Sequence, residues 1–173
     1  MILPPVRDPR LVTIRRGGSL TDEHHRLLAL WAADCAERVL PLFAREQPDD
    51  PRPRVAVEAV RAWTRGEMPM MRSRAAGGHA MGAARPLEGA GRFAAYAAGQ
   101  AACVPHVAEH DLGAAAYAIK AVRAARPDDP DAGRRERDRQ RELLPDEVRE
   151  LVLEDQGRRD HLCWGVFGSQ PPS

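Results

Sequence analysis

Alanine and glycine occupy most of the positions between residues 75 and 125 where helical spacing places buried side chains. Alanine favours helix more than any other residue and buries little apolar area, so a core built from it requires helices that approach one another closely. No segment alternates polar and apolar residues convincingly, and the β-like piece at 11–14 is short. The pattern therefore predicts an all-α fold, a compact bundle of about six or seven helices with an Ala/Gly-rich core and short turns rich in Pro and Asp.

The length of 173 residues fits one domain with a single hydrophobic core. The N-terminal residues mix several prolines with a pair of glycines and show no helical stripe, so we expect an irregular arm over 1–19. A single all-α domain is predicted over 20–156. Residues 157–173 are polar, then aromatic, then rich in proline, and form a C-terminal tail that either docks on the domain or lies free of it.

Three- and four-residue spacing of apolar side chains divides the domain into seven helical segments. The first begins at Ser19 or Thr21, before acidic residues that suit a helix start, and its apolar stripe reaches Leu42. Asp50 is placed to cap the second, which begins at Pro51. The remaining segments are expected from Met68 to Arg85, from Leu87 to Val104, from Pro105 to Ala125, from Gly133 to Glu142 as a solvated charged face, and after Pro145.

Charge and cysteine usage exclude several classes of function. Basic residues number 26 and acidic residues 25, and no basic run stands without interleaved acids, so nucleic acid is not an expected partner. No stretch approaches the roughly 20 apolar residues that span a bilayer, and the N-terminus lacks an apolar signal region, so neither membrane insertion nor secretion is expected. The three cysteines show no CxxC spacing, which fits a reduced cytoplasmic protein without a disulfide framework. The glycine pairs follow no strand, and no cofactor is expected.

Three charged residues are candidates for chemistry because they fall where the helical period predicts a dry interface: Asp34, His79 and Asp111. Asp111 follows Val107 by one helical turn and, once buried, requires a hydrogen-bond donor. His79 is the donor that periodicity places best. For Asp34, Arg38 lies one turn further along the same helix and predicts an ion pair within it.

His106 and His110 are four residues apart in the predicted segment from Pro105 to Ala125. Histidines at this spacing can chelate a metal, but the residues between them do not form the HExxH pattern and no third ligand is evident. No metal site is therefore predicted, and both histidines are expected to face solvent. His110 shares its helix face with Tyr117.

The chain resembles the putative immunity proteins of bacterial polymorphic toxin systems. The resemblance is carried by Leu30–Phe43, Pro48–Arg54 and Ala62-Trp63, and later by Gln100-Ala101-Ala102, His106-Val107-Ala108, Tyr117–Ala121 and Leu143-Leu144-Pro145. It covers most of the chain from Leu27 to Leu153, and it implies an all-α domain that binds and neutralises a toxin. No catalytic residues come with it. The chain departs from the family at Met68–Met71 and in its tail.

A non-enzymatic protein that binds a protein partner is therefore the favoured interpretation, and the resemblance makes a toxin that partner. The charge is abundant but balanced, so electrostatic complementarity would set the specificity. No catalytic signature competes with this interpretation. The candidate binding residues are Trp31, Trp63, Met70, Tyr96, His110 and Tyr117.

The alternative is a small-molecule binding protein or an enzyme of a specialised biosynthetic pathway. Its pocket between helices would be lined by Trp31, Trp63, Phe93, Tyr96 and Tyr117, and Asp34, His79 and Asp111 would act as acid, base or orienting groups. This alternative requires the three charged residues to converge on a cavity of at least about 300 Å³. A third interpretation is a homo-oligomeric module whose Ala/Gly faces are contact surfaces.

Overall fold

The computed structural model of the chain describes residues 2–168 and is all-α, as predicted. Within that range it contains eight α-helices, three short 3-10 helices and no strand, with one isolated bridge between Thr13 and Leu20. The α-helices are α1 (Asp22–Glu37), α2 (Leu40–Glu46), α3 (Arg52–Thr64), α4 (Met70–Ala83), α5 (Gly89–Cys103), α6 (His110–Ala125), α7 (Ala132–Glu142) and α8 (Asp146–Arg159). The 3-10 helices are η1 (Pro9–Leu11), η2 (Ile14–Arg16) and η3 (Asp160–Cys163). The predicted count of six or seven helices is therefore too low.

The additional helix arises because the predicted first segment is broken at Arg38 and Val39. Pro41 lacks an amide hydrogen and sits in the first turn of α2, where that loss costs no helical hydrogen bond, so a new helix starts there. The predicted start of the first helix is confirmed. The Thr21 hydroxyl accepts a hydrogen bond from the His24 amide at 3.1 Å and caps α1.

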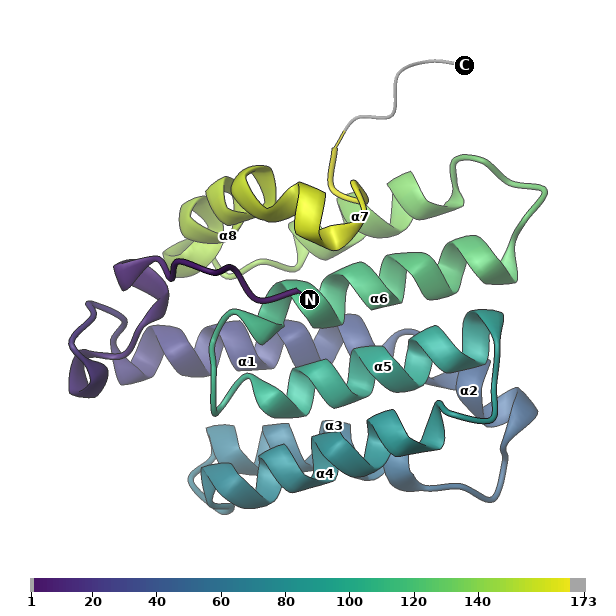
Figure 1. Ribbon diagram of the computed structural model, residues 1–173, viewed down its shortest axis with the longest axis horizontal. Coiled ribbons are helices and arrows are strands. Elements are labelled where there is room, and N and C mark those ends of the chain that lie inside the picture. The colour runs from purple at the N-terminus through teal and green to yellow at the C-terminus, as the bar shows by residue number, and fades with distance from the viewer. Residues whose placement is uncertain (1, 169–173) are drawn as a thin grey trace.

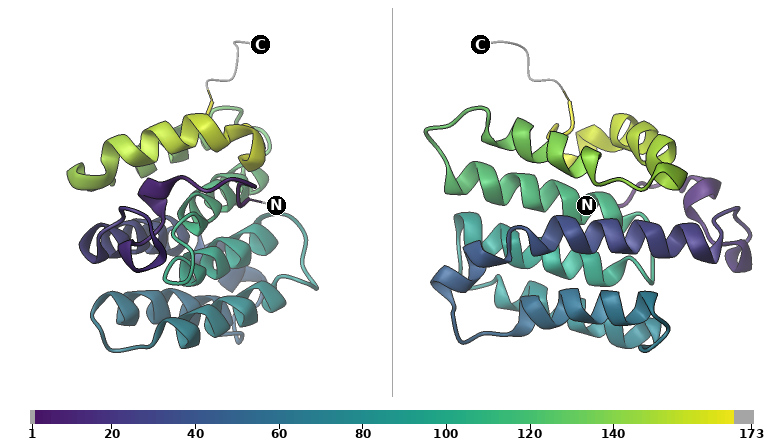
Figure 2. Two further views of the ribbon diagram at one scale, coloured as in Figure 1. Left: turned by 60° about the vertical axis from the view of Figure 1, so that its left-hand side comes forward. Right: turned by 180° about the vertical axis from the view of Figure 1, so that it is seen from behind.

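The helices are stacked along one direction (Figure 1, Figure 2). The pair α3 and α4 forms one end, α1 and α5 lie next to it, α6 follows, and α7 with α8 covers the opposite end. Helix α5 is central because it contacts α1, α2, α3, α4 and α6. The N-terminal segment with η1 and η2 lies on the flank of the stack, beside the first turn of α1.

Close contact between α4 and α5 shows how a core of small side chains is built. About half of the buried apolar residues are alanines. Gly77 and Gly99 bring the two backbones together, since an ideal Cβ at Gly77 would lie 2.7 Å from the carbonyl oxygen of Gly99. A Cβ at Gly99 would lie 2.9 Å from the carbonyl oxygen of Gly77. The helix pair therefore has no room for a methyl group at this crossing.

We expect Gly77→Ala to lower the free energy of unfolding by about 1–3 kcal/mol, because the added methyl group must push two backbones apart. Its neighbour provides a matched control, since a Cβ at Gly78 meets nothing within 4 Å. Gly78→Ala should be neutral or stabilising, because alanine is the better helix former by up to about 1 kcal/mol. Urea unfolding followed by circular dichroism measures both variants. Equal stability of the two would contradict the backbone contact between α4 and α5.

The charged block at 133–142 forms α7, but the expectation that it is a solvated face is wrong for Glu136 and Gln140, which are buried. Glu136 accepts two hydrogen bonds from the Arg38 guanidinium at 3.1 Å each. The Gln140 amide donates to the carbonyl oxygen of Ala115 at 3.2 Å. Polar side chains can occupy this helix interface because their charges and donors are matched across it.

The structure also corrects the predicted start of α6 and shows where the tail lies. α6 begins at His110 rather than at Pro105, because residues 104–109 form a turn. Beyond α8 and η3, the side chains of Val166 and Phe167 are buried, so the described part of the tail docks on the domain. The proline-rich end of the tail, residues 169–173, lies outside the described residues.

Candidate functional site

The predicted pairing of Asp111 with His79 is wrong. His79 lies on an exposed face of α4. Asp111 is buried as expected, but it faces Arg159 of α8, whose Nη2 lies 3.4 Å from the Asp111 Oδ1. The same oxygen accepts a hydrogen bond from the Leu112 amide at 2.6 Å. Oδ1 of Asp111 is therefore bound from α8 and from its own helix, whereas Oδ2 is buried without a partner among the described residues, and α4 supplies no partner to either oxygen.

Asp34 also has a partner other than the predicted one. Its carboxylate is partly exposed and accepts a hydrogen bond from Arg61 of α3 at 2.8 Å, whereas Arg38 binds Glu136. Asp34, His79 and Asp111 consequently occupy three separate places in the fold. They do not converge on a cavity, so the geometry that the enzyme alternative requires is absent from the described residues.

The predicted aromatic pocket is likewise divided among three places. Trp31 lies in the core, where its indole N–H donates to the Gln140 carbonyl oxygen at 2.8 Å. Trp63 and Met70 line one cavity together. Tyr96 and Tyr117 lie against each other elsewhere, with ring centroids 5.1 Å apart, and Phe93 contacts Tyr117. No single pocket unites these residues.

His110 is half-buried, which corrects the expectation that it faces solvent. Its Nδ1 lies 2.7 Å from Oε1 of Gln100 on α5. Burial lowers the pKa of its imidazole to about 4, so the ring is neutral near pH 7. His106 lies in the turn before α6 and does not share a helix face with it. Among residues 2–168, no three His, Cys, Asp or Glu side chains are grouped to hold a metal ion, and the three cysteines are free and buried.

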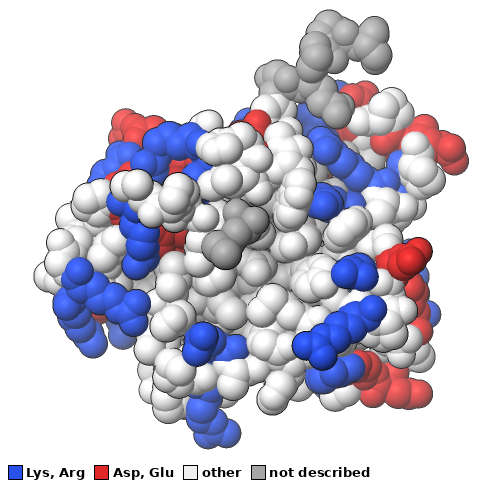
Figure 3. All heavy atoms as spheres, in the orientation of Figure 1, with Lys and Arg blue, Asp and Glu red and all other residues white. Residues whose placement is uncertain are grey.

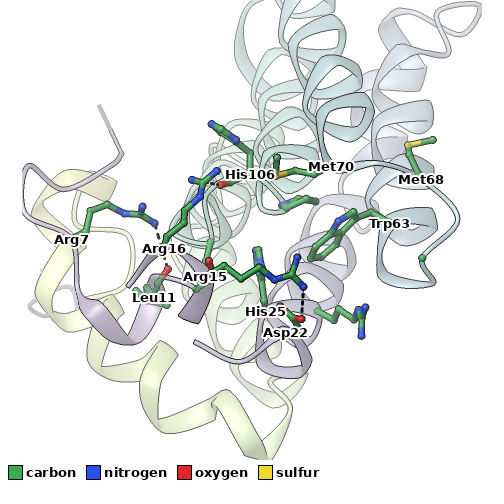
Figure 4. A pocket seen from close by; sticks show the side chains of 15 residues that line it. Arg7, Leu11, Arg15, Arg16, Asp22, His25, Trp63, Met68, Met70 and His106 are labelled. Carbon is green, nitrogen blue, oxygen red and sulfur yellow. Dashed lines mark hydrogen bonds and ion pairs between the residues drawn. The ribbon is translucent and has the colours of Figure 1, made fainter. Parts of the chain in front are cut away.

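A cavity of about 440 Å³ lies where the N-terminal segment meets the start of α1, the C-terminal end of α3, the start of α4 and the turn before α6 (Figure 4). We name it the arm cavity. Arg15 and Arg16 come from the N-terminal segment on one side, and Trp63 and Met68 lie on the other. It is lined by Arg7, Leu11, Thr13, Arg15, Arg16, Asp22, His25, Arg26, Trp63, Gly66, Met68, Met70, Pro105, His106 and Ala108.

The apolar wall of the arm cavity is held in place by a buried histidine. The ring of His25 meets Trp63 edge-on, with centroids 4.9 Å apart and planes at 62°. Nε2 of His25 lies 2.8 Å from the carbonyl oxygen of Val104. Burial lowers the pKa of His25, which favours the neutral ring in this contact. Trp63 is therefore a fixed apolar surface facing the arginines.

The remaining lining of the arm cavity is electropositive. Its four arginines are Arg7, Arg15, Arg16 and Arg26, and Asp22 is the only carboxylate in the lining. Arg15 pairs with Asp22 at 2.7 Å. In the part of the chain that the structure describes, Arg16 and Arg26 have no carboxylate within 4 Å. Two guanidinium groups are thus left without a counter-charge beside the cavity.

His106 lies in the same electropositive surroundings. Its Nδ1 is buried and has no hydrogen-bond partner among the described residues. Arg16 donates to its backbone carbonyl oxygen at 3.4 Å. Burial lowers the pKa of His106 first, and the charges of Arg74 and Arg16 lower it further. The arm cavity can therefore receive a carboxylate, and it disfavours a cationic ligand.

A network of ion pairs, centred on buried carboxylates, fastens the N-terminal segment to α8 and to the start of α6. We name it the charge cluster, and its members are Arg7, Asp8, Arg10, Glu109, Asp111, Glu154, Asp155, Arg158 and Arg159. Arg7 donates two hydrogen bonds to Glu109, at 2.8 and 2.6 Å. Arg158 bridges Asp8 and Asp155 at 2.8 and 2.7 Å. Because Arg7 and Asp8 precede η1, the charge cluster positions one wall of the arm cavity.

Sequence reasoning missed Arg159 and Asp155 although a signal for both was present. Asp155 follows Val148 by seven residues and Val152 by three, which is the spacing of one buried helix stripe, and Arg159 follows one turn later. The prediction ended the domain at residue 156, so the buried stripe was not followed from Asp155 to Arg159. The arginines of the arm cavity carry no such signal, since Arg15 and Arg16 lie in an irregular segment.

Comparison with known protein families places the chain in a family. The family model described as Imm-5 like putative immunity protein matches residues 18–147, from just before α1 to the first turn of α8. No curated protein and no solved structure matches the chain. Among the described residues, no helix combines the length and the apolar character needed to cross a bilayer.

Proposed function

The chain belongs to the family of Imm-5 like putative immunity proteins, and we propose that it is a non-enzymatic protein that binds and neutralises a protein toxin, with the arm cavity as a contact site. The unpaired positive charge beside an apolar wall carries this proposal. Arg16 and Arg26 supply the charge, and Trp63 supplies the wall.

The chemistry of the arm cavity selects an acidic segment of the toxin. A carboxylate that enters it would form charge-assisted hydrogen bonds with the planar guanidinium groups of Arg16 and Arg26. An apolar side chain next to that carboxylate would pack on Trp63 and Met70. Opposite charge would also speed the encounter and reject basic partners.

We expect the double charge reversal Arg16→Glu with Arg26→Glu to weaken toxin binding at least about 100-fold, since both contacts become repulsive. Each protein encoded beside this chain's gene is expressed in a bacterial host under an inducible promoter. The toxin among them should arrest growth, and the wild-type chain should restore growth when it is co-expressed. The double variant should fail to restore growth, and calorimetry with the purified toxin measures the loss of affinity.

Arg85→Glu is the matched control. Arg85 is exposed and follows the C-terminal end of α4, whereas the arm cavity lies at the start of this helix, and no carboxylate within the described chain pairs with Arg85. This variant should restore growth as well as the wild-type chain does. If no neighbouring protein is toxic in a way that the chain relieves, the immunity role is wrong. If the double variant still protects the host, the role stands and the arm cavity is not the contact site.

A further inference from the structure

A second surface stands out because aromatic side chains from three elements meet on it. Phe93 and Tyr96 come from α5, Tyr117 comes from α6, and Trp164 follows η3. The Tyr117 ring lies 5.1 Å from Tyr96, 5.0 Å from Trp164 and 6.3 Å from Phe93, measured between ring centroids. We name this surface the aromatic patch. It gathers half of the chain's phenylalanine, tyrosine and tryptophan residues, including both tyrosines.

The chain's only lysine, Lys120, lies on the aromatic patch. Its Nζ is 3.8 Å from the ring centroid of Trp164 and 4.6 Å from that of Phe93, which is cation–π geometry. Within residues 2–168 no carboxylate lies within 4 Å of this ammonium group, and burial lowers its pKa. The charge is thus held by rings and has no counter-charge.

Arg92 is a second cation at the aromatic patch. Its Nη2 donates to the Tyr96 hydroxyl at 3.2 Å and its Nη1 to the Leu87 carbonyl oxygen at 3.3 Å. Among the described residues it has no ion pair either. The face formed by α5 and α6 shows a broad uncharged centre with basic groups beside it and acidic groups toward its edge (Figure 3). A partner for this surface is therefore apolar with negative charge.

Trp164 is placed on this surface at a conformational cost. Its φ of 58° lies in the left-handed region that large side chains rarely adopt, and its relative accessibility is 47%. Exposed tryptophan beside tyrosine and cationic groups is typical of the energetic centre of a protein interface. Trp164 also lies beyond residues 18–147, so it belongs to the part of the chain outside the family match.

We propose that the aromatic patch is a second contact surface for the protein partner, and that it receives a carboxylate flanked by apolar side chains. This inference rests on the proposed function and gives the partner an attachment point separate from the arm cavity. The carboxylate would accept hydrogen bonds from Lys120, and a neighbouring apolar side chain would cover Trp164. Because the rings already restrain the ammonium group, little side-chain freedom remains to be lost on binding.

The three tryptophans of the ¹⁵N-labelled full chain make a site-resolved test. The probe is the peptide acetyl-Leu-Asp-Leu-Glu-Leu-amide, and the indole N–H signals are assigned by Trp→Phe substitutions. The Trp164 signal should shift and saturate during the titration. The Trp31 signal should stay fixed, because that N–H is bonded to Gln140 in the core. The Trp63 signal reports binding at the arm cavity independently.

Charge variants separate recognition from a purely structural role of Lys120. Lys120→Gln should weaken peptide binding at the Trp164 signal about fivefold or more, whereas Lys120→Arg should restore it. The peptide with Asn and Gln in place of its acidic residues should show a similar loss. Arg126→Gln removes an exposed cation at the end of the same helix and should change nothing at Trp164.

The outcomes divide cleanly between the two proposals. An unshifted Trp164 signal, or equal affinity of Lys120→Gln and the wild-type chain, overturns the second contact surface. If Lys120→Gln lowers stability but leaves the titration unchanged, Lys120 only fastens η3 to α6, and the inference is also overturned. The growth assay with the toxin is unaffected by these results, so a failure here leaves the immunity role standing.

Discussion

Replacing Arg159 by methionine is expected to lower the free energy of unfolding by about 3–5 kcal/mol, the usual result of removing one partner from a buried ion pair. Arg159 donates from Nε to Oδ1 of Asp155 at 3.0 Å and from Nη1 to the Glu109 carbonyl oxygen at 2.9 Å. It also faces Asp111, and both aspartates are buried. Methionine fills similar space but removes the only donor to Oδ2 of Asp155, the guanidinium partner of Asp111, and the side-chain donor to the carbonyl oxygens of Glu109 and Ile2. Urea unfolding followed by circular dichroism measures the loss.

Arg158→Met is a matched control because Arg158 is adjacent in the chain and also binds Asp155, at 2.7 Å. Its side chain is about half exposed, so solvent screens its ion pairs and its loss should cost no more than about 1 kcal/mol. If both variants lose the same stability, burial of the Arg159 contacts is not what makes them strong. A loss below about 1 kcal/mol for Arg159→Met would contradict the charge cluster as the anchor of the N-terminal segment.

The fold class could be predicted from the sequence because helical spacing is a local signal. The positions of alanine in α5 and α6 and the Thr21 cap specify helices without knowledge of any neighbour. The break between α1 and α2 was also marked, by Pro41. The predicted number of helices was too low because the apolar stripe that runs to Leu42 was given more weight than Pro41.

The pairing of charges could not be predicted in the same way. Helical periodicity places Asp111 inside the bundle, but it does not say which helix faces it. Proximity along the chain suggested Arg38 for Asp34, and helical period suggested His79 for Asp111, whereas the fold supplies Arg61 and Arg159. Partners across a bundle depend on the order in which helices stack, and short turns permit several orders. Sites that depend on such pairs appear only in the assembled structure.

The charge cluster holds more carboxyl groups than guanidinium groups, and this imbalance makes the stability of the folded chain depend on pH. The cluster contains the guanidinium groups of Arg7, Arg10, Arg158 and Arg159 and the carboxyl groups of Asp8, Glu109, Asp111, Glu154 and Asp155. One carboxyl group is therefore in excess. Oδ2 of Asp111 is buried without a partner among the described residues, and burial raises the pKa of Asp111 to about 7. Asp111 is thus the group that holds the proton.

When folding raises the pKa of a carboxyl group, the free energy of unfolding decreases as the pH rises. The folded chain binds a proton at Asp111 between about pH 4 and pH 7 that the unfolded chain has released, so the stabilisation is complete below about pH 4 and is lost as the pH rises through 7. The lowered pKa values of His25, His106 and His110 act in the opposite direction as the pH falls below 6.5, and for His110 this effect extends to about pH 4. Total stability against pH therefore mixes both effects, and a comparison of two proteins is needed.

Asp111→Asn removes the proton site and balances the charge cluster, so the difference between variant and wild type isolates Asp111. That difference in unfolding free energy should move in favour of the variant as the pH rises from 5 to 8, by up to about 1.4 kcal/mol per pH unit. The histidine effects cancel because both proteins contain them. A difference that stays constant over this range would mean that Asp111 is already ionised at pH 5, and the excess negative charge would then have to be neutralised elsewhere in the cluster.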